Sequence, residues 1–297
     1  MSNYIVKNIE EKIRELFCGK DCSLKLVSMG LWSQDLLVYR SSDGRQFAAK
    51  VSRPECLNIL KNEVKAMEEV SKHYPYVIPK YYGSFWLDGR LVIVNEYVDF
   101  SPFTFYGARS ISLESSRCFV DFLVGKEGKG AGTASFPEGF VEFFEGHEDW
   151  PNVTQFIPEW AGKLSNITCI PQHGDLALTN VYIYEEKILV IDWEDFGFVN
   201  IPGFDLFVFL LSCSDQNITI MKSYFDESGQ PIGLKNIIQR ASIELHRVLG
   251  EPWENFIPLY ILLLLFLKHK LGYGKLIQEK IGFIVSKMIK EVGVSGK

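Results

Sequence analysis

Two different hydrophobic periodicities divide this chain, and they constrain its fold more strongly than any other feature. In about the first hundred residues, short strand-like apolar runs are separated by turn dipeptides. Beyond residue 98, apolar residues recur mainly at the spacing of helices. This change predicts an α+β protein with two lobes: a small, mainly β domain over residues 1–98 and a larger, mainly helical domain over residues 99–297.

The N-terminal domain is predicted to be an antiparallel sheet with one inserted helix, preceded by an amphipathic helix. The dipeptides Asp43-Gly44 and Asp88-Gly89 lie between apolar runs and indicate two hairpin turns. Pro54 opens the inserted helix, which extends to about His73. The expected strands cover residues 24–27, 36–40, 47–51, 81–86 and 91–97.

The C-terminal domain is predicted to be mainly helical, with one β-hairpin. Its strands cover 181–184 and 188–192 and are joined through Glu185, Glu186 and Lys187. A glycine-rich stretch, 125–139, has no Gly-Lys-Ser/Thr in register and is interpreted as a surface loop. The expected helices lie near residues 204–214, 232–249, 253–271 and 275–292. A small β lobe followed by a larger helical lobe predicts a cleft between them.

The composition is that of a globular protein and excludes several other classes. Of the 297 residues, 47% are hydrophobic and 14% aromatic, which is too apolar for a disordered chain. The formal net charge is −6, so broad electrostatic capture of nucleic acid is not expected. The strongest apolar run, 257–267, is shorter than the ~20 residues that a membrane-crossing helix needs. It is therefore predicted to be buried core.

The N-terminus and the cysteines indicate a location inside the cell. Residues 1–20 alternate apolar and charged side chains and lack the apolar core of a secretory signal. The six cysteines contain no CxxC pair, and their spacing fits neither a zinc site nor a disulfide framework. A cytoplasmic protein with reduced thiols is expected, without a nucleic acid or membrane partner.

The segment around Asp175 carries the strongest chemical signal. Asn180 follows Asp175 by five residues, and Asp192 follows twelve further on, at the end of an apolar strand. A carboxylate and a carboxamide on one short loop can accept a proton and hold a hard cation, which a second carboxylate can hold from another side. Each residue alone is typical of a turn or a strand end, but the ordered set favours a site.

This segment, His173-Gly174-Asp175 to Asn180 and on to Asp192, resembles the HGDxxxxN…IDxE signature of the aminoglycoside phosphotransferase and choline kinase families. Those families share the protein-kinase-like fold. Gly174 stands where the protein-kinase catalytic loop, H-R-D-x-x-x-x-N, has Arg, which favours the small-molecule branch. Asp205 looks like the second Asp of choline-kinase-like sequences, and it also fits a helix N-terminus stabilised by the helix dipole.

The resemblance implies transfer of the γ-phosphoryl group of ATP to a hydroxyl of a small molecule, such as an aminoglycoside, choline, ethanolamine or a sugar. Asp175 would accept the hydroxyl proton, and Asn180 and Asp192 would hold Mg²⁺. His173 would brace the loop. Asp195 begins a literal Asp-Phe-Gly kinase motif, but it lies outside the strand, so Asp192 is the predicted metal ligand.

The N-terminal domain supplies the nucleotide-binding residues that the resemblance implies. Lys50 lies in a strand like the one that carries the phosphate-contacting Lys, and Glu63 is its expected partner, with Glu68 and Glu69 as competitors. The phosphate-covering turn falls at 28–33 and includes Ser33, although Gly30 is its one glycine. The hinge between the lobes would be Asn95-Glu96-Tyr97-Val98, whose backbone, at Glu96 and Val98, would bind the adenine edge.

The acceptor side is less defined by the sequence. Acidic residues over 138–149 fit attraction of a cationic acceptor or a solvated helix face: Glu142, Glu145, Glu148 and Asp149. Aromatic residues are expected there too: Trp193, beside Glu194, and Trp253, Phe256 and Tyr260. Two alternatives are a kinase acting on a polypeptide and a non-catalytic nucleotide-binding pseudokinase. The missing Ala-Pro-Glu segment disfavours the first, and the retained Asp175, Asn180 and Asp192 disfavour the second.

Overall fold

A computed structural model describes residues 3–19, 21–29, 34–99, 101–103, 111–127, 132–146, 154–214 and 232–270. The chain forms two compact units. Unit 1 comprises Met1–Cys118 and Thr179–Phe196, and unit 2 comprises Phe119–Leu178 and Gly197–Lys297. Ser33 and the helix expected near 275–292 lie outside the described residues. The domain boundary between residues 98 and 99 stays a prediction.

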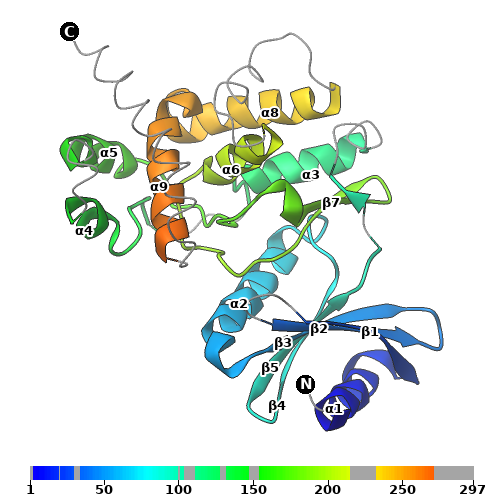
Figure 1. Cartoon of the computed structure of the whole chain (residues 1–297). Coiled ribbons are helices and arrows are strands. Elements are labelled where there is room, and N and C mark those ends of the chain that lie inside the picture. Colours follow the sequence, from blue (N-terminus) through cyan, green and yellow to red (C-terminus); the bar gives the residue numbers. More distant parts are fainter. Residues whose placement is uncertain are drawn as a thin grey trace. The chain divides into compact units, whose positions relative to one another are not determined.

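Unit 1 contains the predicted antiparallel sheet of five strands (Figure 1). Its spatial order is β1-β2-β3-β5-β4, and every neighbouring pair is antiparallel. Each strand covers one of the apolar runs found in the sequence, except that Tyr97 lies just past the last one. The strands are β1 (Cys22–Met29), β2 (Gln34–Ser41), β3 (Gln46–Ser52), β4 (Tyr81–Leu87) and β5 (Arg90–Glu96).

Two helices contact the sheet through different sets of strand side chains. Helix α1 (Asn3–Ile13) buries Ile9 and Ile13 in one cluster with Val92 and Val94 of β5. Helix α2 (Leu57–His73) places Leu60 in another cluster with Leu91 and Ile93. Successive side chains of a strand point to opposite faces, so α1 and α2 cover opposite faces of the sheet. Short helical turns, η1 (Arg14–Cys18) and η2 (Pro54–Cys56), follow α1 and precede α2.

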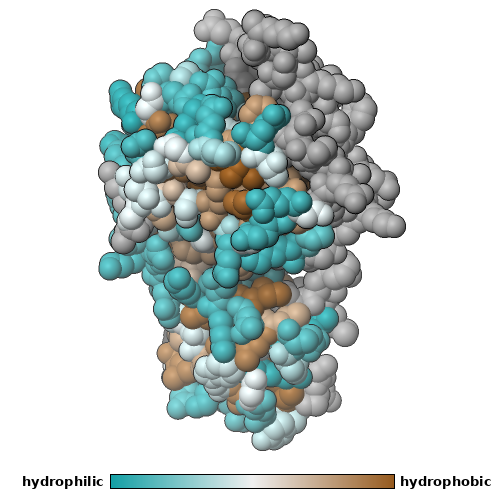
Figure 2. Space-filling view, turned by 90° about the vertical axis from the view of Figure 1, so that its left-hand side faces the viewer, coloured by the Kyte–Doolittle hydropathy of each residue, from teal (hydrophilic) through white to brown (hydrophobic). Residues whose placement is uncertain are grey.

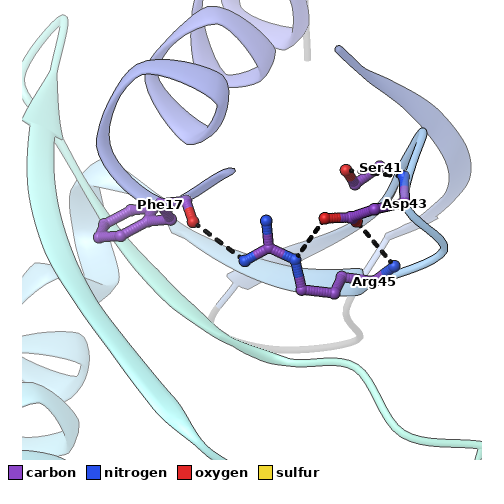
Figure 3. A network of polar contacts seen from close by, with 4 residues as sticks. All are labelled: Phe17, Ser41, Asp43 and Arg45. Atoms are coloured by element: carbon purple, nitrogen blue, oxygen red, sulfur yellow. Dashed lines mark hydrogen bonds and ion pairs between the residues drawn. The ribbon is translucent and has the colours of Figure 1, made fainter. Parts of the chain in front are cut away.

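The β2–β3 hairpin turn is fastened to the end of η1 by a network of polar contacts (Figure 3). Arg45 Nε donates to Asp43 Oδ2 at 3.0 Å, and Arg45 Nη1 donates to the Phe17 carbonyl at 3.4 Å. The Asp43 amide donates to Ser41 Oγ at 3.4 Å. Hydrogen bonding with Ser41, supported by Arg45, lowers the pKa of Asp43 to about 2. The Asp43-Gly44 turn was predicted, but its contact with Phe17 depends on the fold.

A second, three-stranded sheet in unit 1 has the order β6-β7-β8. Strands β7 (Val181–Tyr184) and β8 (Lys187–Val190) form the predicted hairpin, and the short strand β6 (Ser101–Pro102) adds to β7. The predicted three-residue connection is wrong, because Lys187 already pairs with Tyr184. Glu185 and Glu186 alone form the turn, both with positive φ (46° and 65°), as two-residue hairpins require.

Unit 2 is mainly helical, as predicted (Figure 1). The apolar run 257–267 lies in α9 and, Pro258 apart, is buried, which confirms its assignment to the core. Helix α3 (Leu113–Leu123) begins in unit 1 and ends in unit 2. The other helical elements are α4 (Phe140–Glu145), η4 (Thr154–Phe156), α5 (Ile157–Leu164), η5 (Leu178–Asn180, at the boundary of the units), α6 (Phe204–Cys213), α8 (Ile232–Leu249), η6 (Trp253–Phe256) and α9 (Ile257–Lys270).

Among the described residues, no single helix has the length and hydropathy to cross a membrane. Two consecutive helices, Leu234–Leu249 and Trp253–Lys270, together have a sufficient length and composition, but the chain bends by 73° between them. On the face shown in Figure 2, apolar residues form small patches separated by hydrophilic ones. The exposed large apolar side chains are scattered along the chain and include Trp86, Leu113 and Phe198. Single exposed apolar residues of this kind are normal for a protein surface.

Candidate active site

Strand alternation directs Lys50 toward α2. Its neighbours Ala49 and Val51 belong to the buried cluster on the α1 face of the sheet, so the Lys50 side chain emerges on the other face. There its Nζ lies 2.5 Å from Glu63 Oε1 and 3.2 Å from Asp192 Oδ1. The structure thus brings together three residues that the sequence predicted for nucleotide and metal binding, all within unit 1.

Helix geometry decides which glutamate of α2 pairs with Lys50. Glu63 is buried at 1% exposure, whereas Glu68 is exposed. Five residues correspond to about 140° around a helix, so Glu63 and Glu68 cannot face the same strand residue. The predicted pairing of Lys50 with Glu63 is confirmed as a contact, and its role in nucleotide binding stays a prediction.

The β7–β8 hairpin brings Asn180 close to the segment that ends in Asp192. Asn180 directly precedes β7, and Val181 pairs with Val190, so the two chain segments lie side by side at the open end of the hairpin. The Ile191 amide donates to the Asn180 carbonyl at 3.0 Å. Asp192 has φ = 68°, a left-handed conformation that is uncommon outside glycine and is concentrated at functional sites.

The charges around Lys50 favour its protonated form. Burial by itself would lower the pKa of the Lys50 ammonium, but the carboxylates of Glu63 and Asp192 raise it above its ordinary value. A half-exposed Asp192 (38% of its side chain) and a largely buried Lys50 (16%) therefore form a fixed positive and negative pair at the surface of the pocket. Such a pair can hold a phosphate oxygen on one side and a cation on the other.

A pocket in unit 1 surrounds these groups. Its apolar lining includes Leu36, Ala48, Met67, Pro79, Val190, Ile191 and Trp193, and its polar lining consists of Lys50, Glu63, Asn95, Tyr97 and Asp192. Within the part of the chain that the structure describes, two buried side-chain acceptors lack a hydrogen-bond partner, Glu63 Oε2 and Asn95 Oδ1. Both line this pocket. An apolar slot with a few convergent polar groups is typical of a small-molecule site.

The four residues of the predicted hinge line two different pockets. Asn95 and Tyr97 line the pocket of Lys50, whereas Glu96 and Val98 line a separate pocket in unit 1 with Tyr184. Alternation of side chains along β5 explains why Asn95 and Glu96 face different pockets. Adenine binding by the backbone of this segment stays a prediction.

Asn62 makes contacts that sequence reasoning missed. Its Nδ2 donates to the carbonyl of Glu194 at 2.6 Å and to that of Phe196 at 3.1 Å. These bonds fasten the turn that follows Asp192 to helix α2. Trp193 is buried at 1% exposure and donates from Nε1 to the Val190 carbonyl at 3.1 Å, which fixes the same segment from the inside. Asp195 lies within this turn, three residues beyond Asp192.

In unit 2, Asp205 holds the backbone of the loop that carries Asp175. Its Oδ2 accepts the His173 amide at 2.6 Å, and its Oδ1 accepts the Gly174 amide at 3.0 Å. The Asp175 amide donates to His173 Nδ1 at 3.3 Å, and His173 is fully buried, as its predicted bracing role requires. Asp205 also lies in the first turn of α6, which confirms its interpretation as a helix N-terminal residue.

Burial raises the pKa of Asp205 to about 7, with a further increase from Asp175, while its two backbone hydrogen bonds oppose the rise. The unfolded chain therefore releases this proton near pH 4, whereas the folded chain keeps it to about pH 7. Because the folded state binds more protons in this window, the contribution of Asp205 to the free energy of unfolding is lost as the pH rises from 4 to 7.

We expect Asp205→Asn to flatten this dependence. Guanidinium denaturation at several pH values should show the free energy of unfolding of the wild type falling more steeply between pH 4 and 7, by up to about 4 kcal/mol over the window. Asp88→Asn, at an exposed turn, is the matched control and should keep the wild-type slope. If the free energy of unfolding falls equally steeply with pH in the wild type and in Asp205→Asn, the raised pKa of Asp205 is contradicted.

The corner before Asp205 needs glycine. Gly203 has φ = 89°, and a Cβ at this position would lie 2.6 Å from the Tyr260 hydroxyl oxygen. That hydroxyl donates to the Pro202 carbonyl at 2.6 Å. Tyr260, Trp253 and Phe256 are at most 1% exposed and pack on one another, so the expectation that these aromatics line an acceptor site is wrong. They form the core that supports the corner.

Lys268 is a further residue whose contact sequence reasoning missed. It lies in the last turn of α9, and its Nζ is 2.8 Å from Asp175 Oδ1. No signal in the sequence connects residues 93 positions apart. On α4, Glu142 and Glu145 are exposed, in agreement with a solvated helix face, and Glu148 and Asp149 lie outside the described residues.

Comparison with solved structures identifies the fold. The chain is similar to the amicoumacin kinase hAmiN, whose structure was solved in complex with AMP-PNP, Ca²⁺ and Ami. The match covers 98% of this chain and 93% of the amicoumacin kinase, with a TM-score of 0.54 and 14% identity. The choline kinase LicA from Streptococcus pneumoniae (TM-score 0.53, 15% identity) and the aminoglycoside 2'-phosphotransferase-IIIa in its GDP complex (0.53, 13%) each match 98% of this chain over their full length.

No family model matches the chain, and no curated protein matches its sequence. The similarity lies in the three-dimensional structure. The chain has the α+β protein-kinase-like fold that aminoglycoside phosphotransferases and choline kinases share, which confirms the predicted fold class.

Proposed function

We propose that this protein is a small-molecule kinase that transfers the γ-phosphoryl group of ATP to a hydroxyl. The observation that carries the proposal is the contact of Lys50 with Glu63 and Asp192 at the polar end of an otherwise apolar pocket. A fixed ammonium beside a partly exposed carboxylate suits the phosphates of a nucleoside triphosphate, and the apolar lining suits its nucleobase. The fold shared with nucleotide-binding kinases supports the same conclusion.

The residues present fit a divalent cation. Asp192 and Asn180 offer carboxylate and carboxamide oxygens, the hard ligands that Mg²⁺ prefers. In the described ranges, no group of three or more His, Cys, Asp or Glu stands in metal-binding geometry. Mg²⁺ does not need one, because it keeps several waters and binds phosphate oxygens. Mg²⁺ held by these residues would neutralise the negative charge of the phosphates.

The chain's own residues divide the remaining work. Lys50 positions the phosphates, and Glu63 holds Lys50 in place. Asp175, one-third exposed and on a loop braced by Asp205, accepts the proton of the acceptor hydroxyl. The acceptor is a small alcohol of the kind that the sequence resemblance implies. Which further residues bind the acceptor depends on which alcohol it is.

Mg-ATP should stabilise the protein against unfolding. At 100 times its Kd, a ligand that binds only the folded state raises the free energy of unfolding by about 2.7 kcal/mol. We expect a rise of this size in a denaturation series with Mg-ATP and a much smaller one with ATP and EDTA. Lys50→Met should lose the effect, whereas Lys65→Met, at an exposed position on α2, should keep it. No stabilisation by millimolar Mg-ATP would overturn the proposal.

Binding alone does not separate a kinase from a pseudokinase. Release of ADP should therefore be followed with a panel of small alcohols: aminoglycosides, choline, ethanolamine and sugars. Acceptor-dependent ADP release identifies an enzyme and its substrate class together. Binding of Mg-ATP with no release above the wild-type background for any acceptor would favour the non-catalytic alternative.

A further inference from the structure

A lysine from the far end of the chain is paired with the proposed catalytic carboxylate. Lys268 Nζ lies 2.8 Å from Asp175 Oδ1, both residues belong to unit 2, and both side chains are largely withdrawn from solvent, with 16% and 32% exposure. Ion pairs shielded in this way are screened less by water and salt than surface pairs. The contact therefore influences the orientation of the carboxylate.

The place of Lys268 at the end of α9 does not by itself explain why its side chain contacts Asp175. The residues of α9 before it are almost all buried and apolar, and the helix then ends in Lys268, His269 and Lys270. Any cation in this last turn stabilises the negative end of the helix dipole. However, His269 packs on Phe143 and Lys270 lies exposed over the ring of Phe198, whereas Lys268 is directed to Asp175.

The charged groups near Asp175 oppose one another. Asp205, in contact with the backbone of the same loop, places a buried carboxyl close by, and the two carboxyl groups repel one another when both are ionised. His173 Nδ1 accepts the Asp175 amide and is thus engaged with the backbone. Lys268 supplies the opposite charge, and its contact with Oδ1 fixes how the Asp175 carboxylate is turned.

We propose that Lys268 is a positioning residue for the phosphoryl-transfer step, holding the Asp175 carboxylate in the orientation in which it accepts the hydroxyl proton. The inference rests on the proposed function. In that step the acceptor oxygen forms a bond to the γ-phosphorus as the bond to the β–γ bridging oxygen breaks. The hydroxyl proton passes to Asp175 and ADP leaves, while Lys268 keeps its own proton throughout. A carboxylate can accept several hydrogen bonds at once, so the lysine contact and the hydroxyl contact are compatible.

The test compares Lys268→Met with Lys270→Met. Both variants remove one cation from the last turn of α9, so they share the effect on the helix dipole and differ in the contact with Asp175. We expect Lys268→Met to lower kcat by about 10- to 100-fold with an unchanged KM for ATP, because the carboxylate loses its orientation. Lys270→Met should keep wild-type kinetics.

Rescue by the conservative variant separates positioning from a merely structural role. Lys268→Arg keeps a cationic donor in the last turn of α9 and should restore most of the wild-type kcat. A merely structural role would instead lower the melting temperature and leave kcat and the KM for ATP near their wild-type values. If Lys268→Met matches Lys270→Met in kcat, the inference is wrong, even if its melting temperature falls.

The outcome for the wild type distinguishes this inference from the proposed function. Wild-type turnover that depends on Asp175 but is indifferent to Lys268 overturns the inference alone. Absence of acceptor-dependent turnover in the wild type overturns the proposed function, and this inference with it. Turnover that falls in Lys268→Met and recovers in Lys268→Arg supports both.

Discussion

Replacing Asp175 by Asn should lower kcat by ~10²–10⁴ while the Kd for ATP stays nearly constant, because the change removes a general base and little else. Asn keeps the size of the side chain and one acceptor oxygen for Lys268, which contacts Oδ1 at 2.8 Å. The expected loss equals roughly 2.7–5.4 kcal/mol of transition-state stabilisation at 1.36 kcal/mol per decade. Steady-state kinetics with the acceptor found in the panel, and calorimetry with ATP, give the two quantities.

Two outcomes for Asp175→Asn would refute the assignment. Turnover near the wild-type rate would show that another group accepts the proton. Loss of ATP binding would show instead that Asp175 serves the metal or the fold. A melting temperature close to that of the wild type is the control, because the loop remains held by the bonds from Asp205 to the His173 and Gly174 amides.

Replacing Asp192 by Asn should abolish Mg²⁺-dependent nucleotide binding. The carboxylate is the stronger of the two proposed metal ligands, and a neutral amide attracts Mg²⁺ less strongly and does not balance the charge of Lys50, whose Nζ is 3.2 Å away. Asn is also the substitution that the backbone tolerates best, since the φ of 68° at this position is the left-handed conformation that Asn and Asp accept. The effect will therefore report on charge.

Asp195→Asn is the matched control for Asp192→Asn. It makes the same chemical change three residues later, in the turn fastened by Asn62, and should leave most of the Mg²⁺-dependent binding intact. The measurement is the Kd of ATP at saturating Mg²⁺ and in EDTA. EDTA should reduce the affinity of the wild type to that of Asp192→Asn. The opposite ranking of the two variants would make the literal Asp-Phe-Gly motif the metal site.

Local pattern was sufficient to predict the elements that carry the site. Alternating apolar residues with turn dipeptides define the strands of unit 1, and each predicted strand is present. The spacing of Asp175, Asn180 and Asp192 could be interpreted because a hairpin between the last two is encoded in adjacent sequence. Errors at this level were small, such as the one-residue difference at Lys187 in the turn, because element ends depend on a few hydrogen bonds.

Choices among similar residues needed the three-dimensional structure. Three glutamates of α2 were candidates for Lys50, and only the facing of the helix against β3 selects Glu63. Trp253, Phe256 and Tyr260 have the composition of an aromatic binding box, yet the packing of α9 buries them. Composition cannot separate these cases, because a buried aromatic and a ligand-binding aromatic have the same side chain.

By itself, the sequence determined which residues carry reactive groups and, through short-range periodicity, which strand, loop or helix holds each. Only the tertiary structure decided which distant groups meet. Lys268 reaches Asp175 across 93 residues, and Asn62 binds the backbone of Glu194 across 132. Such contacts leave no local pattern, because their geometry is set by how helices pack on a core and not by the preferences of neighbouring residues.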